Sequence, residues 1–577
     1  MTTVEAGRPP RAARDAARPG EAGLLWRQTR HELVTLSRIP ITLILSIGLP
    51  LVFFVILSAL VGNSVVDERT GVRLVQYLAP GMASFGVVMA TFSFLAVGLS
   101  EARSTGVLKR QSGTPVPRWV LIGGRMGAAL VLGLTATALI LAAGLLFYGL
   151  QVPTRSVAAI VVTLLFASAC FSALGLALAV ALPSMQMTLA VTNGIVIPLA
   201  FISDMFMIGG RMPDWLSTIG WLFPLRHLTA VFRDALNPYL SGAGFELDHL
   251  AVLALWGLAG AVAATLLLRR DRDRAGAAAT GSGRAHVHGR AADAAPVNTA
   301  APSTFSLVLG QVRHTQSILW RDWSAVFFAV AFPVLLVAII PSVNGGGDVR
   351  LSNGQLLGTF YAATMAVYGA AVTAYVNMPQ GLAEDRERGV LKRTGATPLP
   401  AVALLVGRVV GALAVALLTA FDIALLAAIA YRPAYPRGLP AAVLTLVVAT
   451  VCFAVLGLAV MSFVRSAQAA VGVTLGTLLP LAFISDIFVV GASFPPVIEA
   501  ISWFFPLRHA ASAMTQAVAP DLTGSGLALD HLAVLLAWTV VGAVVVALRF
   551  RWETSEAATR PGRRRPVAGQ TARTSSR

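Results

Sequence analysis

Charged residues are scarce in this chain of 577 residues: Asp, Glu, Lys and Arg together make up 12% of it. A soluble globular protein carries about 25%. Hydrophobic residues account for 56% of the chain, and its mean hydropathy is +0.75. These values exclude a soluble enzyme or binding module and indicate an integral membrane protein.

Cysteine and lysine are almost absent. The two cysteines, Cys170 and Cys452, lie in apolar runs, which excludes a disulfide framework or a cysteine-rich zinc site. The two lysines, Lys109 and Lys392, are each followed by arginine, so neither completes the Gly-x-x-x-x-Gly-Lys-Ser/Thr pattern of a phosphate-binding loop. We therefore expect no ATPase, bound cofactor or metal site in this chain.

Twelve apolar stretches are long enough to cross the ~30 Å hydrocarbon core of a membrane as helices. In the first half of the chain they are 41–62, 75–100, 119–147, 156–182, 188–210 and 249–268. In the second half they are 324–343, 356–382, 401–430, 439–463, 469–491 and 531–549. The predicted fold class is therefore an all-α membrane protein.

The two halves are copies of one another. The segment Gly106–Arg110 recurs unchanged at Gly389–Arg393, 283 positions later, and Phe223–His227 recurs at Phe505–His509, 282 positions later. Because each copy holds an even number of spans, both enter the membrane in the same direction, as parallel repeats do. We predict 12 transmembrane helices in two six-helix units that form a pseudo-dimer, with a possible pathway at their seam.

The two units are expected at 39–269 and 304–552. A cytoplasmic arm with an interfacial helix is expected at 1–38, a flexible linker at 270–303 and a basic disordered tail at 553–577. Basic residues concentrate in these three segments and in the loops after the second stretch of each half. The positive-inside rule then places both termini in the cytoplasm. Topology and anionic lipid explain the net charge of +17, and we expect no nucleic-acid partner.

The most informative segments follow the second apolar stretch of each half. Residues 101–110 read Glu-Ala-Arg-Ser-Thr-Gly-Val-Leu-Lys-Arg, and residues 384–393 read Glu-Asp-Arg-Glu-Arg-Gly-Val-Leu-Lys-Arg. Each segment combines charges with a short amphipathic turn after glycine, and a Thr-Pro pair follows. Such a turn suits either docking into a groove on a soluble partner or anchoring at the inner lipid surface. Two near-identical copies favour a partner with twofold symmetry.

The pattern Glu-x-Arg-x-x-Gly-x-Leu-x-Arg, followed by Thr-Pro, resembles the ABC-2 type permease family, and the resemblance covers nearly the whole chain twice. It implies that each loop forms a coupling helix against a separate ATP-binding subunit, expected as a dimer that holds ATP and Mg. The implied coupling residues are Glu101, Arg103, Gly106, Leu108, Glu384, Arg386, Glu387, Arg388, Gly389 and Leu391. Ala102 and Ser104 replace the usual acidic residues, which predicts unequal coupling by the two halves.

The long outer segments 211–248 and 492–530 are rich in aromatic residues and arginine. They either anchor the chain at the membrane interface or, as the resemblance implies, form re-entrant helices that cap a pathway. Asp204 and Asp486, near the outer ends of spans, are expected either to pair with arginines or to cap those ends in water. The pathway and gate candidates are Asp204, Arg226, Asp486, Arg508, Asp422 and Asn193.

We therefore expect the permease of an ATP-driven exporter in a bacterial cell membrane. The resemblance implies a hydrophobic or amphipathic small molecule, such as a drug or antibiotic, as its cargo. The alternative is a secondary active antiporter, which needs carboxylates deep in several spans, whereas only Asp422 lies within one. A membrane-embedded enzyme needs clustered catalytic groups at one depth, and the eight histidines are scattered along the chain. We predict no catalytic residue.

Overall fold

The computed structural model describes most of the chain. The described residues are 20–38, 43–61, 65–67, 72–111, 113–205, 213–242, 244–280, 303–321, 326–343, 346–351, 354–397, 399–431, 438–464, 466–488, 494–519 and 524–550. They are helical except for turns, one bridge and a small antiparallel pair of strands, β1 (Val65–Asp67) and β2 (Val72–Arg73). The predicted helical fold is confirmed.

Helices of the first half are repeated in the second. The first half comprises α1 (Glu21–Ser37), η2 (Ile44–Gly48), α3 (Leu49–Val61), α4 (Leu74–Val88), η3 (Met89–Phe94), α5 (Leu95–Ser104), α6 (Val107–Gln111), α7 (Arg118–Phe147), η4 (Thr154–Ser156), α8 (Val157–Ala181), α9 (Met185–Ile202), α10 (Asp214–Leu222), α11 (Pro224–Leu236) and α12 (Leu247–Thr280). The second comprises α13 (Thr304–Leu319), η5 (Phe327–Ala331), α15 (Phe332–Val343), α16 (Leu357–Ala371), η6 (Val372–Asn377), α17 (Met378–Glu387), α18 (Val390–Gly395), α19 (Ala401–Ala430), α20 (Leu439–Phe463), α21 (Ala467–Ile484), α22 (Pro496–Phe504), α23 (Pro506–Ala517) and α24 (Leu529–Arg549). Corresponding helices begin 282 or 283 positions apart, as the sequence repeats predict.

Local sequence signals set several of the matching helix starts. The Ser184 hydroxyl accepts a hydrogen bond from the Met187 amide at 3.2 Å at the start of α9, and Ser466 does the same for α21 at 3.1 Å. A serine at this position satisfies an amide that has no partner inside the helix. Pro224 and Pro506 begin α11 and α23, where proline loses no hydrogen bond.

Ten described helices are long and apolar enough to cross a membrane, and two shorter apolar helices lie at Ser46–Ala59 and Ala329–Ser342. The outer ends predicted for the fifth stretch of each half, 188–210 and 469–491, were wrong. Helices α9 and α21 end at Ile202 and Ile484, and residues 206–210 and 489–491 lie outside the described ranges.

The range of the predicted flexible linker, 270–303, overlaps the end of a helix. Helix α12 continues past residue 270 to Thr280. The rest of the predicted linker up to residue 302, residues 1–19 of the predicted arm and the predicted basic tail all lie outside the described ranges.

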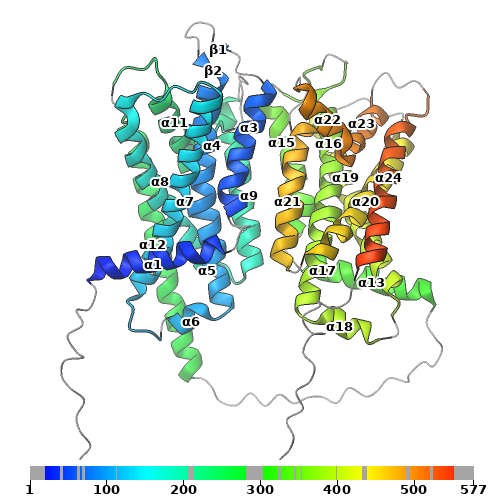
Figure 1. Cartoon of the computed structure of the whole chain (residues 1–577), viewed down its shortest axis with the longest axis horizontal. Helices are drawn as coiled ribbons and strands as arrows, with labels where there is room; N and C mark the ends of the chain where they lie inside the picture. Colours follow the sequence, from blue (N-terminus) through cyan, green and yellow to red (C-terminus); the bar gives the residue numbers. More distant parts are fainter. Residues whose placement is uncertain are drawn as a thin grey trace, which may run out of the picture.

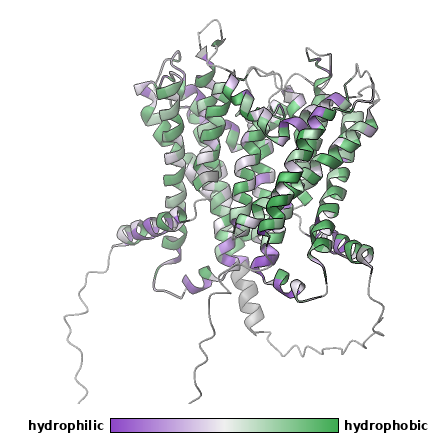
Figure 2. Cartoon of the chain, turned by 45° about the vertical axis from the view of Figure 1, so that its right-hand side comes forward, coloured by the Kyte–Doolittle hydropathy of each residue, from purple (hydrophilic) through white to green (hydrophobic). Residues whose placement is uncertain are grey.

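The long helices form two bundles that stand side by side, one from each half of the chain (Figure 1). Helices α1 and α13 lie across the lower ends of the two bundles and pack against α7 and α19 respectively. The short helices α6 and α18 lie at the same end. Figure 2 shows hydrophobic residues along the long helices and hydrophilic residues in α1, α13 and the lower turns. This distribution suits a bundle in lipid with a polar lower face in water.

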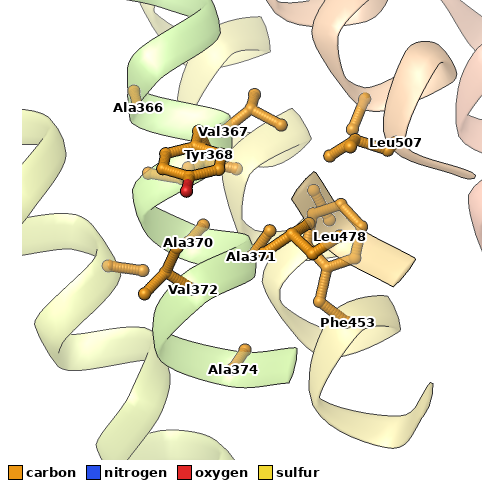
Figure 3. Close-up of a cluster of buried hydrophobic side chains, with 14 of the residues drawn as sticks. Ala366, Val367, Tyr368, Ala370, Ala371, Val372, Ala374, Phe453, Leu478 and Leu507 are labelled. Carbon is orange, nitrogen blue, oxygen red and sulfur yellow. The ribbon is translucent and has the colours of Figure 1, made fainter. Parts of the chain in front are cut away.

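The second span of each half is the centre of its bundle. In the spans Leu74–Ser104 and Leu357–Glu387, 83% of the residues of the most apolar window are buried, against 22–56% in the other long helices. Figure 3 shows part of the second core, where Tyr368 and the small residues around it on α16 and η6 lie close to Phe453 of α20 and Leu478 of α21. The helix that leads into each predicted coupling loop is therefore the one most enclosed by its neighbours.

Two glycines let other helices pack on the backbone of this central span. A Cβ atom at Gly175 of α8 would lie 2.8 Å from the Phe92 carbonyl oxygen, and one at Gly457 of α20 would lie 2.9 Å from that of Ala374. Both carbonyls belong to π-helical turns, η3 and η6, which are often found at functional sites. Glycine is thus required for the close approach in both halves.

Candidate functional site

A cavity of about 400 Å³ lies at the seam between the two halves. Helices α3, η3, α5 and α9 of the first half and α16, η6, α17, α19 and α21 of the second supply most of its lining. Apolar side chains dominate the lining. Its polar residues are Ser93, Gln186, Asn193, Thr315, Gln316, Tyr368, Thr373, Asn377 and Gln380, and its charged residues are Glu384, Asp385, Arg388 and Arg408. A cavity of this size and character holds one small organic molecule.

The two ends of the cavity differ. At the end near the lower loops, the Arg388 side chain is 61% exposed, so the cavity meets water there. At the other end, aromatic rings meet across the seam: the centroids of Phe53 and Phe483 lie 4.4 Å apart, and those of Phe483 and Phe488 lie 4.9 Å apart. The Tyr368 ring continues this cluster, 5.0 Å from Phe488. The cavity is therefore open towards the loops and closed by aromatic packing at its far end.

The halves also touch beside the loops. The Gln468 side-chain amide donates to Glu101 Oε1 at 3.2 Å, which links the start of α21 to the end of α5. Deeper in the seam, a Cβ atom at Gly194 would lie only 2.8 Å from the Phe327 ring, so α9 packs directly on η5. Any separation of the halves must break the hydrogen bond between Gln468 and Glu101 and move α9 relative to η5.

The predicted coupling loops are helix–turn–helix segments, and glycine makes each turn. Helix α5 leads into α6 through Gly106 at φ +72°, and α17 leads into α18 through Gly389 at φ +69°. No neighbouring atom lies within 4 Å of a Cβ atom at either position, so the left-handed backbone and not space requires glycine. Both glycines that the resemblance implied have this structural role.

The second coupling loop is firmly tied to its bundle. The Arg386 guanidinium donates to the carbonyl of Met461, at 3.4 Å, and to that of Val464, both at the end of α20. Glu387 Oε1 accepts from the Ala467 amide at 2.8 Å, at the start of α21. The loop is thus hydrogen-bonded to both sides of the turn that joins the fourth span to the fifth.

Among the described residues, a different set of contacts ties the first coupling loop to its bundle. The Arg103 guanidinium donates to the Val180 carbonyl at 3.1 Å near the end of α8, which corresponds to the contact of Arg386. Ser104 stands where the second half has Glu387, and its hydroxyl donates to the Glu101 carbonyl within its own helix at 2.9 Å. Because serine stands here in place of glutamate, Ser104 does not form the hydrogen bond to the start of the fifth span that Glu387 forms in the second half.

An arginine on the third span forms a half-buried ion pair in each half, but with different helices. In the second half Arg408 of α19 pairs with Asp385 of α17. In the first half Ala102 replaces that acid, and the equivalent Arg125 of α7 pairs with Glu32 of α1 at 3.2 Å. In the second half the arginine of the third span thus pairs with the helix that leads into the coupling loop. In the first half it pairs with α1 and also donates to Gln111 Oε1 of α6 at 3.4 Å.

Two of the predicted coupling residues are the leucines of α6 and α18. Leu391 is 1% exposed and belongs to the core of the second bundle, and Leu108 packs against the small buried cluster that contains Leu99. Each leucine packs towards its own bundle, and a coupling role for both stays a prediction. The outward residues of α6 and α18 are the Lys-Arg pairs 109–110 and 392–393, whose side chains are exposed.

At the opposite end of each bundle, two short helices form a hairpin against the tip of the fifth span. Asp204 and Asp486 follow α9 and α21 in left-handed conformation, at φ 59° and 56°. Arg226 of α11 lies 3.3 Å from Asp204, and Arg508 of α23 lies 3.2 Å from Asp486. Each carboxylate therefore pairs with an arginine, which is the first of the two alternatives for these residues.

These arginines also satisfy the free carbonyls of the helix ends. Arg226 Nη1 donates to the Ile202 carbonyl at 2.9 Å, and Arg508 Nη1 donates to that of Ile484 at 3.2 Å. Each guanidinium lies over a tryptophan ring of the same hairpin, with its carbon 4.6 Å and 4.4 Å from the ring centroid. Burial lowers the pKa of Arg226, an effect that Asp204 opposes. Such contacts let non-spanning backbone lie within the bundle.

Sequence reasoning missed a histidine pair in each hairpin. His227 and His249 meet through their Nδ1 atoms at 2.9 Å, and His509 and His531 do so at 3.0 Å. His227 Nε2 must donate to the Trp221 carbonyl at 2.8 Å, so in the neutral pair its Nδ1 accepts from His249. Four of the eight histidines are therefore not scattered but tie each hairpin to the sixth span.

The family comparison supports the same two-unit division. The family model described as ABC-2 type transporter matches residues 24–237 and again 311–518. Each match begins in the interfacial helix of one half and ends just after its outer hairpin.

The chain belongs to the ABC-2 type transporter family.

The predicted resemblance is thus confirmed, twice over in one chain. Membership of this family makes the protein a multi-pass membrane transport permease.

Two relatives illustrate the relation. The inner membrane transport permease YadH of Escherichia coli K12 is 24% identical over 181 residues, which cover 31% of this chain and 70% of YadH. The daunorubicin resistance ABC transporter permease protein DrrB1 of Streptomyces coeruleorubidus is 28% identical over 287 residues, which cover 47% of this chain and 92% of DrrB1. DrrB1 thus corresponds in extent to about one half of this ABC-2 chain.

The structure separates the predicted pathway residues into two groups. Asn193 lines the seam cavity. The two Asp–Arg pairs and Asp422 are not among the lining residues of this cavity; Asp422 is half-buried in α19. Arg408, which the sequence analysis did not assign, and Gln468, a further polar candidate on the fifth span, belong to the seam or its loops. They occupy the same positions in the repeat as Arg125 and Gln186. This match was visible in the sequence, but its meaning became clear only from the fold.

Proposed function

We propose that this ABC-2 chain is the membrane-spanning permease of an ATP-driven exporter in a bacterial cell membrane. Helices α3 and α15 complete 12 spans, and both termini lie in the cytoplasm. The cargo is a hydrophobic or amphipathic small molecule, and the cavity at the seam is its entry site. ATP and Mg are held by a separate ABC ATP-binding dimer, and this chain has no catalytic residue.

One observation carries this proposal: the mouth of the cavity and the second coupling loop share side chains. Glu384, Asp385 and Arg388 line the cavity and lie directly before the turn at Gly389. A partner that displaces the loop must therefore move the cavity wall. The shared residues offer a direct mechanical route from ATP binding to the transport pathway.

The antiporter alternative has less support. Proton coupling needs carboxylates that change charge within the pathway. The two carboxylates that line the cavity, Glu384 and Asp385, both form ion pairs at its mouth. The relative DrrB1 is named for daunorubicin resistance, which supports a small-molecule cargo for this chain as well.

The exposed Lys-Arg pairs define what the partner must present. Lys109, Arg110, Lys392 and Arg393 face outward from α6 and α18. Complementary charge across an interface speeds association and selects the partner. The docking grooves of the ATP-binding dimer are therefore expected to be acidic.

Reversing these four charges to glutamate is expected to abolish complex formation. Co-purification of an ABC ATP-binding subunit from the same genome should fall by about tenfold or more, since several like-charge contacts would each cost energy at the interface. The matched control reverses two exposed arginines of the interfacial helices, Arg30 and Arg313, and should retain the partner. Equal loss in the control, or no ATP-binding subunit bound to the wild-type chain, would contradict the proposal.

A further inference from the structure

The two facing walls of the seam cavity differ in polarity. On η6 and α17, the residues that line the cavity include Thr373, Asn377, Gln380 and Glu384. Their spacing of three or four residues places them along one helix face. The second half therefore presents a polar stripe that runs from the mouth of the cavity into the membrane.

Three of the four equivalent positions of the first half are apolar, and the fourth is again a glutamate. Subtracting the repeat offset of 283 gives Ala90, Phe94, Val97 and Glu101. Phe94 and Val97 line the cavity together with Met89. The second span of the second half is therefore more polar along this stripe than that of the first half, where Ser93, Gln186 and Asn193 supply the polar lining residues.

Several polar atoms of the cavity lining have no partner among the described residues. They are Thr373 Oγ1 and Asn377 Nδ2 on the polar wall, Thr315 Oγ1 and Arg408 Nε elsewhere in the second half, and Ser93 Oγ on the first-half side. Thr373 is only 4% exposed. Buried polar groups are nearly always hydrogen-bonded, so unpaired ones around a cavity indicate that a ligand completes them.

The charges of the lining cancel. Glu384 pairs with Arg388 at 3.2 Å, and Asp385 pairs with Arg408. These four are the charged residues that line the cavity. A charged ligand would find no unpaired counterion there, whereas an uncharged one would not disturb either pair.

We propose that the seam cavity binds an uncharged amphipathic molecule in one orientation, with its hydrogen-bonding edge on the Thr373–Asn377 wall and its apolar or aromatic face on the Phe94 wall. The proposal rests on the proposed function, because it takes the cavity to be the cargo site. It adds the chemical class of the cargo and the half of the protein that selects it.

Three fluorescent probes with one ring system test this proposal: 9-methylanthracene, 9-anthracenemethanol and the cationic 9-(aminomethyl)anthracene. Saturable binding is measured on the full chain in nanodiscs without any ATPase, with empty nanodiscs subtracted. The alcohol should bind the wild-type chain about threefold to tenfold more tightly than the methyl compound, as one added hydrogen bond allows. The cation should bind no more tightly than the methyl compound.

The variant Thr373→Val with Asn377→Leu keeps side-chain size and should remove the preference for the alcohol while leaving the methyl probe unchanged. Thr192→Val, a buried threonine of α9 outside the cavity lining, should keep the preference, and thermal melting should show that both variants fold. Tightest binding of the cation, or a preference that survives the double substitution, would overturn the proposal. Selective binding without any ATP-coupled activity would refute the exporter function and leave this assignment standing.

Discussion

A chain carrying Asp385→Leu and Arg408→Met is expected to fold normally. In complex with the ATP-binding subunit, its ligand-stimulated rate of ATP hydrolysis should be about tenfold lower than that of the wild-type chain. The two side chains are 18% and 10% exposed. Replacing a buried ion pair by apolar side chains of similar size is often neutral for stability. The substitution therefore removes the tie between α17 and α19 without leaving an unpaired charge, and motion of the coupling loop no longer reaches the third span.

The first half supplies the matched control. Glu32→Leu with Arg125→Met removes the equivalent ion pair, which joins α7 to α1, together with the longer hydrogen bond of 3.4 Å from Arg125 to the uncharged Gln111 of α6. This variant should keep most of the stimulated hydrolysis. Equal losses in both double variants, at equal melting temperatures, would show that the difference between the ion pairs has no bearing on coupling.

Arg508→Ala is expected to destabilise the protein by about 2–4 kcal/mol, more than Arg226→Ala. The Arg508 guanidinium bonds Ile484, Ser502 and Asp486, and its loss leaves that aspartate without the arginine beside it. In the first half Asp204 retains Arg233, whose Nη1 lies 3.7 Å from it. The second half has Thr515 at the position of Arg233. Thermal unfolding in detergent should rank the two variants.

The pH dependence gives an independent check on the Arg508→Ala variant. Burial raises the pKa of Asp486, and Arg508 opposes that rise. Removing the arginine should raise the pKa further. A carboxyl group whose pKa is higher in the folded than in the unfolded state adds stability as the pH falls. The variant should therefore regain melting temperature between pH 8 and pH 5 relative to wild type, and a constant difference would contradict the assigned pairing.

The repeat made most of the fold predictable. Long apolar stretches and motifs repeated at a near-constant offset located the spans, and the Gly-Val-Leu-Lys-Arg segments located both loops. The fifth span was predicted too long because its apolar run continues past Ile202, whereas the helix ends where Arg226 binds the Ile202 carbonyl. That contact joins residues of different elements, and periodicity cannot report it.

The candidate site was less predictable because its chemistry depends on differences between the copies. Ala102 in place of an acid suggested weaker coupling, but the partner that Arg125 finds in Glu32 follows only from the packing of α1 on α7. The contrast between Asn377 and Phe94 was visible in the aligned repeats. Its meaning emerged only when both residues were found to line one cavity.

The most direct test of the central claim is to tie the two halves together at the seam. In a chain with Cys170→Ala and Cys452→Ala, the substitutions Glu101→Cys and Gln468→Cys replace the side chains that meet at 3.2 Å, and a reducible bifunctional thiol reagent joins them. Ligand-stimulated ATP hydrolysis of the complex in liposomes should stop in the bridged chain, return on reduction and persist in each single-cysteine control. Full activity in the bridged chain would contradict a pathway that opens between the halves.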